Sequence, residues 1–455
     1  MKRDLDLFTY AIDMYKTENQ VADLSGEANV SDASDKSTVI RYIDLFAGLG
    51  GTRLGFAQAC IEKNFQPECV FTSEIKEFAV SVYKDNFQEA DIHGDITQID
   101  PLSIPKFDYL LAGFPCQPFS SAGKRNGFLD ERGGLFFTIH QILKIKNPQG
   151  FLLENVDGLA THDKGKTLAV IIAKLEELNY KVSWEILDSS DFGVPQKRKR
   201  IYIVGHKKHR PNLKKFDHFF KTAGDCIEQT APVKQTAFTK LLSSKFSADE
   251  LIGKSIKDKR GGGNNIHSWD LQSKGAVNAE QKKILEQILK KRRYKKWAEA
   301  KGIDWMDGMP LTLEEIQSFH NHPKLEANLN DLTAKGYLKF EHPKKRVVIE
   351  GITKRVPHSG AEKGYNIVAG KLSFPLAKII DPNDVAPTIV ATEAGKIGVV
   401  TQLGVRPITV CEGLRFSGFP DTYKLGEHEY AKAFDLIGNT VMPPVIKAVA
   451  LRLLK

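Results

Sequence analysis

A cysteine enclosed by two prolines is the residue of this chain best suited to covalent chemistry. Cys116 lies in the segment GFPCQP at 113–118, directly after the apolar run 107–112. The apolar run predicts a short buried strand, and the prolines restrict the backbone that follows it. A thiol on a rigid loop at the carboxyl end of a strand is a candidate nucleophile once it is deprotonated. For Cys116 taken alone, a buried structural cysteine in a turn is the alternative.

Two further segments carry groups that suit proton transfer and anion binding. Glu154 follows the apolar run 150–153, so it is predicted at the mouth of a sheet, where a glutamate held protonated is a general acid. Arg198 and Arg200 belong to the segment QKRKRIYIVG at 196–205, in which alternating basic residues precede a predicted strand. Such arginines bind phosphates or a base carbonyl, and a plain basic loop is the alternative.

A glycine-rich segment and two carboxylates predict a site for a nucleoside. The segment DLFAGLGG at 44–51 follows an apolar strand start at 39–43, and its glycines let backbone N–H groups approach a ligand. Glu74 ends the next predicted strand, where an acidic residue accepts hydrogen bonds from ribose hydroxyls. Asp95 lies near the end of a third predicted strand and suits an adenine amino group. Taken singly, these features also fit a tight turn, a helix cap or a solvated turn residue.

The elements that must position these residues follow from the strand and helix patterns. Residues 39–210 alternate strand and helix, which predicts a doubly wound α/β sheet that binds ligands at the carboxyl ends of its strands. The range 211–420 breaks this rhythm and predicts a smaller mixed α+β domain. The range 421–455 ends in a predicted helix, 443–454, expected to return to the first domain. Residues 1–38 predict a short amphipathic helix followed by a polar linker.

The composition narrows the class of partner. The chain has 455 residues, 41% of them apolar, and a formal net charge of +9. This basic balance suits a polyanionic partner. The five cysteines have no paired metal-ligand spacing, so we expect no metal site and reduced thiols, as in the cytoplasm. No apolar stretch is judged long enough to span a membrane, and no signal peptide is recognised, so no membrane association is expected.

Taken in order, the motifs resemble those of the DNA (cytosine-5) methyltransferase family, in its bacterial restriction–modification form. The segments that carry the resemblance lie at 44–51, 73–75, 94–97, 115–117, 154–156, 196–200, 406–420 and 438–441. The resemblance implies the Rossmann-like, doubly wound sheet of S-adenosylmethionine-dependent methyltransferases, with a smaller target-recognition domain. It implies methyl transfer from S-adenosylmethionine to carbon 5 of a cytosine flipped out of duplex DNA.

The resemblance also implies roles for single residues. Cys116 would add to carbon 6 of the cytosine, Glu154 would protonate or hydrogen-bond N3, and Arg200 would contact O2. Arg198 would support Arg200 or hold phosphate. The residues implied around S-adenosylmethionine are Phe46, Gly48, Gly51, Glu74, Ile75, Asp95, Ile96, Asn439 and Thr440. The residues implied against the DNA are Gln117, Ser120 and Thr388.

The middle of the chain contains a basic stretch, 281–300, that is predicted to be helical. Its residues Lys290, Lys291 and Arg292 are candidates for phosphate contact along one DNA strand. A solvated basic helix is the alternative for this stretch. The bases that the protein reads, and the side chains that read them, do not follow from the sequence.

Two other functions remain open at this point. An RNA cytosine-5 methyltransferase would use the same fold and chemistry, but the large middle domain favours the reading of duplex DNA. A catalytically silent DNA-binding protein is opposed by the presence of Cys116, Glu154 and Arg200. The expected partners are double-stranded DNA and a cognate restriction endonuclease that acts on the same site. The protein is expected to be a monomer at the nucleoid in the bacterial cytoplasm.

Overall fold

The computed structural model describes most of the chain after its first 37 residues. The described ranges are 38–88, 91–115, 134–258, 262–304, 308–349, 352–368, 374–391, 393–426 and 429–455. The helix and most of the linker expected in 1–38 lie outside the described residues. Cys116, Gln117 and Ser120 also lie outside them.

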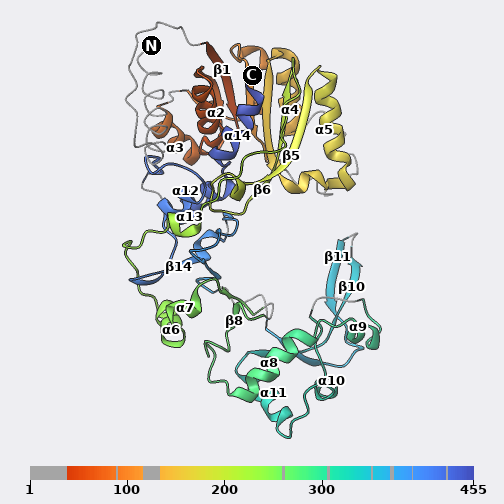
Figure 1. Cartoon of the computed structure of the whole chain (residues 1–455). Helices are drawn as coiled ribbons and strands as arrows, with labels where there is room; N and C mark the ends of the chain where they lie inside the picture. The colour runs from red at the N-terminus through yellow and green to blue at the C-terminus, as the bar shows by residue number, and fades with distance from the viewer. Residues whose placement is uncertain are drawn as a thin grey trace. The chain divides into compact units, whose positions relative to one another are not determined.

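The described residues divide into two compact units (Figure 1). The first unit comprises the described residues within Met1–Glu228, Asp381–Ala394 and Ile408–Lys455, and the second those within Gln229–Ile380 and Gly395–Pro407. Three segments that the sequence division assigned to the recognition domain cluster with the first unit in the structure. These segments are 211–228, 381–394 and 408–420.

The first unit is built on a six-stranded sheet in the order β2-β1-β3-β4-β6-β5. The strands are β1 (Val39–Leu45), β2 (Gln66–Ser73), β3 (Tyr109–Gly113), β4 (Gly150–Val156), β5 (Lys181–Asp188) and β6 (Lys199–His206). Strands β1 to β4 pair in parallel, whereas β6 runs antiparallel to both of its neighbours. Because β2 and β3 lie on opposite sides of β1, the strand order reverses at β1. Open α/β sheets bind ligands beside the carboxyl ends of the strands at such a point.

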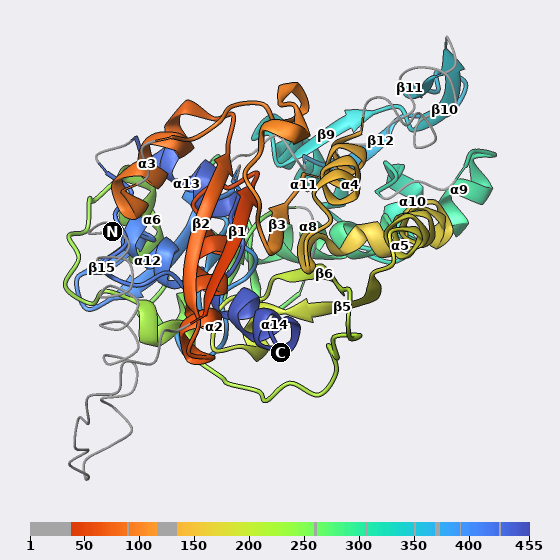
Figure 2. The same ribbon diagram turned by 90° about the horizontal axis from the view of Figure 1, so that it is seen from above.

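Helices cover both faces of this sheet, which confirms the doubly wound architecture (Figure 2). The helices of this unit are α2 (Gly51–Glu62), α3 (Glu77–Phe87), α4 (Leu135–Lys146), α5 (Lys166–Glu177), α12 (Val410–Arg415), α13 (Tyr430–Asn439) and α14 (Pro443–Leu453). One buried core joins the sheet to α4 and α5 through residues such as Ile139 and Ile171. A second core joins the other face to α2 and α14 through residues such as Cys60 and Ile446.

The second unit is a mixed α+β structure. Its helices are α6 (Ala237–Lys245), α7 (Ala248–Leu251), α8 (Ala279–Lys291), α9 (Lys296–Ala300), α10 (Leu313–Gln317) and α11 (Leu325–Ala334). Strands β7 (Ser255–Ile256), β8 (Asn265–Ile266), β13 (Lys378–Ile379), β14 (Ile397–Thr401) and β15 (Gly404–Pro407) form one sheet. Two antiparallel pairs join β9 (Leu338–Glu341) to β12 (Gly364–Ile367), and β10 (Lys344–Ile349) to β11 (Ile352–Pro357). The single helix expected over 281–300 is therefore two helices, because the chain turns between Lys291 and Lys296.

One stretch of the chain passes a length and composition test for a membrane span. The stretch 430–453, which covers α13 and α14, is long and apolar enough by composition to span a membrane. However, 61% of its most apolar window is buried in the structure. Its buried side chains include Val445 and Val449, which belong to the core beneath α2. The apolar character of this stretch is therefore accounted for by packing within the first unit.

Helix α14 crosses α2 so closely that only a glycine fits at the contact. A Cβ atom built on Gly55 of α2 would lie 2.4 Å from the carbonyl oxygen of Pro443 and 2.7 Å from Cβ of Ile446. Real Cβ atoms do not approach other atoms this closely, so any side chain at Gly55 would force the two helices apart. This close approach fixes the start of α14, and with it the segment 438–442 that precedes the helix.

We predict that Gly55→Ala lowers the free energy of unfolding of the first unit by about 1–3 kcal/mol, because overpacking outweighs the gain of about 1 kcal/mol in helix propensity. Denaturant unfolding followed by circular dichroism measures the change. Gly158→Ala is the matched control, because a Cβ atom on Gly158 would meet nothing within 4 Å. An unchanged midpoint in Gly55→Ala would show that α14 can move away without cost.

Candidate active site

Three segments meet at the carboxyl edge of the sheet, beside the point where the strand order reverses. The backbone N–H of Ala47 donates to the carbonyl of Ser73 at 3.1 Å, and the N–H of Glu74 donates to the carbonyl of His93 at 2.9 Å. The N–H of Gly48 donates to Oε2 of Glu74 at 2.8 Å. The glycine-rich segment, the end of β2 and the segment around 93–95 therefore lie side by side, as a single nucleoside site requires.

The glycine-rich segment owes its shape to three unusual backbone positions. Phe46, Gly48 and Gly50 all have positive φ angles, of 57°, 52° and 70°. A Cβ atom on Gly50 would lie 2.3 Å from the ring of Phe87, and one on Gly51 would lie 2.2 Å from the carbonyl oxygen of Val441. At Gly48, by contrast, the nearest atom would be 4.0 Å away. Gly50 and Gly51 are therefore required by packing, whereas the backbone at Gly48 has open space that a ligand can approach.

The residues expected around the cofactor fit a nucleoside. The carboxylate of Glu74 accepts three backbone hydrogen bonds, from Gly48, Ile75 and Lys76. A carboxylate has about four acceptor positions, so about one remains for a ribose hydroxyl. The side chain of Ile75 is 71% exposed and offers an apolar surface for adenine.

The expected strand before Asp95 is wrong. Among the described residues just before Asp95, only His93 pairs with the sheet, in a single bridge to Ser73. Asp95 instead caps the 3-10 helix Ile96–Gln98, and its Oδ1 accepts both the N–H and the hydroxyl of Thr97. Both of these bonds use the same oxygen, and the side chain is exposed, so the carboxylate can still accept from an amino group. Ile96 is buried and supports this turn from below.

A buried polar cluster is built on Asp44, the first residue of the glycine-rich segment 44–51, and sequence reasoning did not predict its contacts. Asp44 is fully buried and accepts hydrogen bonds from the hydroxyl of Thr52 at 2.6 Å and from that of Tyr83 at 3.0 Å. The guanidinium of Arg53 lies 5.4 Å from the centre of the Tyr83 ring. Burial raises the pKa of Asp44 to about 7, although both hydroxyl donors lower it. The cluster ties β1, α2 and α3 together at the base of the site.

Glu154 lies at the same edge of the sheet, in β4. Its register partner in β3 is Gly113, and its Oε2 would lie 3.7 Å from a Cβ atom on that glycine. Nε of Arg200 is 3.1 Å from Oε1 of Glu154. Glu154 is only 7% exposed, and burial raises its pKa above the ordinary value, while Arg200 and Arg198 lower it by less. The carboxyl group is therefore poised to hold a proton at a higher pH than an exposed glutamate.

The two arginines of the segment 196–205 have different surroundings. The guanidinium of Arg198 is buried and donates to the carbonyl oxygens of Ile389, Gly438 and Thr440 at 3.0–3.3 Å. The side chain of Arg200 is 17% exposed and reaches Glu154. Neither of the two roles expected for Arg198, support of Arg200 or the holding of phosphate, appears in these contacts, because its donors point to backbone carbonyl groups.

Two buried amides also hold the site, and their roles were not predicted from the sequence. Nδ2 of Asn155 donates to the carbonyl oxygen of Phe114, two residues before Cys116 in the sequence, at 3.1 Å. Gln196 donates to the carbonyl of Phe416 at 2.8 Å and accepts from the N–H of Ile389 at 3.0 Å. Both belong to motifs that the sequence displays, but the partners of Gln196 are 193 and 220 residues away. No local pattern could identify such contacts.

Each of the remaining candidates of the first unit takes part in a hydrogen bond that involves a backbone carbonyl group. The hydroxyl of Thr388 donates to the carbonyl oxygen of Lys197 at 2.5 Å, which places this exposed residue next to the arginine segment. Asn439 is exposed, and its Nδ2 donates to the carbonyl of Asp435 at 2.8 Å. Thr440 is buried, and its carbonyl accepts from Arg198.

The basic residues predicted for DNA contact in the second unit are not equivalent. Lys290 is exposed at the end of α8. Nζ of Lys291 lies 4.6 Å from the centre of the Phe319 ring. Arg292 is buried, and its Nη1 donates to Oδ1 of Asn366 at 2.6 Å. The charge of this stretch is thus partly used inside the unit, and among these three only Lys290 is freely exposed to solvent.

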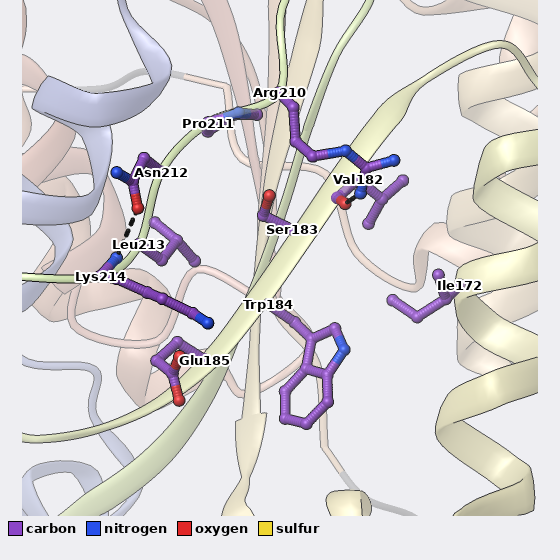
Figure 3. A pocket seen from close by; sticks show the side chains of 10 residues that line it. All are labelled: Ile172, Val182, Ser183, Trp184, Glu185, Arg210, Pro211, Asn212, Leu213 and Lys214. Atoms are coloured by element: carbon purple, nitrogen blue, oxygen red, sulfur yellow. Dashed lines mark hydrogen bonds between the residues drawn. The ribbon is translucent and has the colours of Figure 1, made fainter.

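A surface hollow beside β5 is separate from the site described above (Figure 3). Its lining residues are Ile172, Val182, Ser183, Trp184, Glu185, Arg210, Pro211, Asn212, Leu213 and Lys214. The strand residues among them belong to the first half of β5, which pairs with the end of β6 and not with its start at Arg200. None of the predicted site residues lines this hollow.

Comparison with known proteins gives a consistent family match. Residues 40–455 match the family described as C-5 cytosine-specific DNA methylase. The Type II methyltransferase M.NlaIV of Neisseria lactamica is 52% identical over 422 residues, which cover 91% of this chain and 99% of that protein. M.NgoBV of Neisseria gonorrhoeae is 50% identical over the same shares of both chains. M.BanI of Aneurinibacillus aneurinilyticus is 40% identical over 90% of this chain and 94% of its own.

The buried Asp44 predicts a pH dependence of stability. The folded state keeps this carboxyl protonated up to a pH of about 7, whereas in the unfolded chain it ionises at about pH 4. The protonated carboxyl of Asp44 therefore makes its full contribution to the stability of the folded state below about pH 4. This contribution, roughly 4 kcal/mol, is lost as the pH rises through 7.

We predict that Asp44→Asn, which cannot ionise, removes this part of the pH dependence. Denaturant unfolding between pH 5 and 8 measures the difference between the variant and the wild type. The exposed Asp157→Asn is the control. Parallel stability profiles for wild type and Asp44→Asn would contradict a protonated Asp44.

Proposed function

The chain belongs to the C-5 cytosine-specific DNA methylase family, and we propose that it methylates one cytosine within a specific duplex sequence, with S-adenosylmethionine as cofactor. Its reaction is methyl transfer to carbon 5 of cytosine in DNA, and its similarity to Type II methyltransferases over most of its length indicates a restriction–modification enzyme. The observation that carries the mechanism is the buried carboxyl group of Glu154, bonded to Arg200 where β3 leads into the Cys116 loop.

Carbon 5 of cytosine is a weak nucleophile, so the ring must be activated before it can accept a methyl group. The thiolate of Cys116 adds to carbon 6 and forms a carbon–sulfur bond, which moves electron density towards N3 and carbon 5. Glu154 donates its proton or a hydrogen bond to N3 and so stabilises the charge that develops there. Once carbon 5 carries the methyl group, it loses its proton to water, and the electron pair of that carbon–hydrogen bond re-forms the double bond between carbons 5 and 6. The carbon–sulfur bond breaks in the same step, which restores the thiolate, and N3 returns its proton to Glu154.

The residues around the active carboxyl group favour this role for Glu154. Its burial excludes water and keeps the proton at a higher pH than in an exposed glutamate. Arg200 bonds Glu154 and remains partly exposed, so its other donors can reach the O2 atom of a bound cytosine. Asn155 donates to the carbonyl of Phe114 and so fixes the backbone two residues before Cys116 in the sequence.

The cofactor site is proposed at the edge where the strand order reverses. S-adenosylmethionine, when bound, supplies the methyl group that carbon 5 of the activated cytosine takes up. Gly48 offers open backbone, Glu74 retains an acceptor for ribose, and Ile75 offers an apolar surface. Phe46, Gly51, Asp95, Ile96, Asn439 and Thr440 complete the proposed set. The aliphatic side chain of Ile75 is exposed and can pack on adenine.

The substrate is proposed to be duplex DNA, with Gln117, Ser120, Thr388, Lys290 and Lys291 among the contacts. Arg292 is left out of this proposal because its guanidinium bonds Asn366 inside the second unit. An RNA substrate is less supported, since the matched family is described as a DNA methylase and the similar proteins of Neisseria are named Type II methyltransferases. We further propose that the protein works as a monomer in the bacterial cytoplasm, beside an endonuclease of the same specificity.

Bisulfite sequencing tests this function directly. A plasmid is isolated from a methylation-deficient host that expresses the chain, and every cytosine is scored for resistance to conversion. One short motif with a single fully resistant cytosine is the expected result. Full conversion of all cytosines, with soluble protein present, would contradict DNA methylation; transfer RNA from the same cells is then tested in the same way.

We predict that Cys116→Ser reduces methyl transfer by at least about a thousandfold, while DNA affinity changes little, because the thiol acts in the chemical step. Transfer of labelled methyl groups and DNA binding are measured in parallel. The wild type should form a covalent complex with DNA that contains 5-fluorocytosine, because fluorine cannot leave as a proton does. Cys411→Ser, at an exposed position, is the matched control. Retained activity in Cys116→Ser would reject the adduct.

We predict that Glu154→Gln lowers kcat by roughly a hundredfold or more, with a small change in the affinity for DNA. In the wild type, kcat should fall as the pH rises through the raised pKa of Glu154, because the proton donor is then lost. This fall should disappear in Glu154→Gln. The exposed Glu177→Gln is the control for loss of a carboxylate. An unaltered pH profile in Glu154→Gln would assign the proton to another group.

A further inference from the structure

The β10–β11 pair is a two-stranded ribbon with an unusual excess of positive charge. Its residues 344–357 include five basic side chains and one acidic side chain. The two strands pair only with each other in the described part of the chain. A backbone hydrogen bond of 2.7 Å from His358 to Pro343 closes its base. In both views the ribbon projects from the remainder of the second unit (Figures 1 and 2).

The pairing register separates the ribbon into two faces. Residues directly opposite in an antiparallel pair share a face, and so do residues two apart along each strand. One face, here called the arginine face, consists of Lys344, Arg346, Val348, Thr353, Arg355 and Pro357. All six of these residues are exposed, and Val348 is 71% exposed. The other face carries Lys345 and Lys354, together with the half-buried Val347 and Val356.

The arginine face places two like charges next to each other. Arg346 lies directly opposite Arg355 in the register. Like charges opposite each other destabilise a strand pair, so this arrangement costs folding energy. In the described part of the chain, none of the salt bridges includes Arg346, Arg355 or the three lysines of the ribbon. A polyanion is therefore the partner that would offset the repulsion.

The shape of the ribbon indicates which polyanion it can bind. The major groove of B-DNA is about 12 Å wide and admits a two-stranded β-ribbon. Arginine is the side chain that most often reads guanine there, because its planar fork bonds O6 and N7 together. Two adjacent arginines on one exposed face could therefore contact guanines at neighbouring positions, while the lysines of the other face are positioned for charge attraction only.

We propose that the arginine face of the β10–β11 ribbon enters the major groove of the target duplex, where Arg346 and Arg355 read guanine bases. This inference rests on the proposed function and names side chains that determine its sequence specificity. The lysines of the opposite face, Lys345 and Lys354, raise affinity through phosphate attraction and carry no sequence information. The arginine face of the ribbon therefore reads bases, whereas the lysines of the opposite face attract phosphates.

The test compares three full-length proteins: the wild type, a variant in which the shape of two basic side chains is changed, and a variant in which two charges are removed. Arg346→Lys with Arg355→Lys keeps both charges but removes the planar fork. Lys345→Gln with Lys354→Gln removes two charges and keeps both arginines. Each protein methylates a library of duplexes in which every base pair of the wild-type target is varied singly, and the rates are compared. Binding to the wild-type target is measured over a range of salt concentrations, and thermal unfolding is recorded for all three proteins.

The proposal expects the double Arg→Lys variant to lose at least about tenfold in discrimination at one or more guanine positions, with an unchanged salt dependence. The double Lys→Gln variant should show a weaker salt dependence and the wild-type pattern of methylated sequences. An Arg→Lys variant that folds and retains wild-type discrimination at every position overturns the proposal, and so does a Lys→Gln variant that alters the pattern. If the double Arg→Lys variant unfolds, the single variant Arg355→Lys is compared with the wild type for discrimination at each position of the target. Absence of methylation by the wild type would instead reject the proposed function.

Discussion

The buried guanidinium of Arg198 is the interaction on which the arrangement of this site depends. Its donors bind three carbonyl oxygens that belong to two segments far away in the sequence, at Ile389 and at 438–440. The cost of burying this charge appears in its pKa, which burial lowers to about 10. The group remains charged at neutral pH, so the carbonyl groups must stay in place to satisfy it. One side chain thus fixes the C-terminal segment against the sheet.

The same charge influences the chemistry of its neighbours. Arg198 and Arg200 lie two residues apart, so they share one face of an extended chain. Arg198 points into the protein and stabilises backbone, which leaves Arg200 as the partner of Glu154 at 3.1 Å. Both arginines lower the pKa of Glu154, yet burial is the larger effect and the net shift is upward. The site therefore combines a carboxyl group whose pKa is raised by burial with a cation that orients it.

The sequence predicted the parts of this structure that local patterns encode. Apolar runs located the strands that precede Cys116 and Glu154, and the alternation of strand and helix predicted the doubly wound sheet. Contacts over long distances were not predictable, because nothing near Gln196 in the sequence indicates that it binds backbone at 389 and 416. The strand expected before Asp95 was wrong because a single bridge and a side-chain cap produce the same turn without a strand.

The second unit shows why the number of basic residues in a segment does not measure its capacity to bind DNA. The stretch 281–300 is rich in lysine and arginine, but Arg292 is buried against Asn366 and Lys291 lies over the ring of Phe319. Those charges stabilise the fold, so the stretch exposes less charge than its composition suggests. The ribbon has fewer basic residues, yet Arg346 and Arg355 face each other in solvent. Charges that repel one another within the folded protein gain most from a polyanion, so the register of the ribbon predicts binding better than composition does.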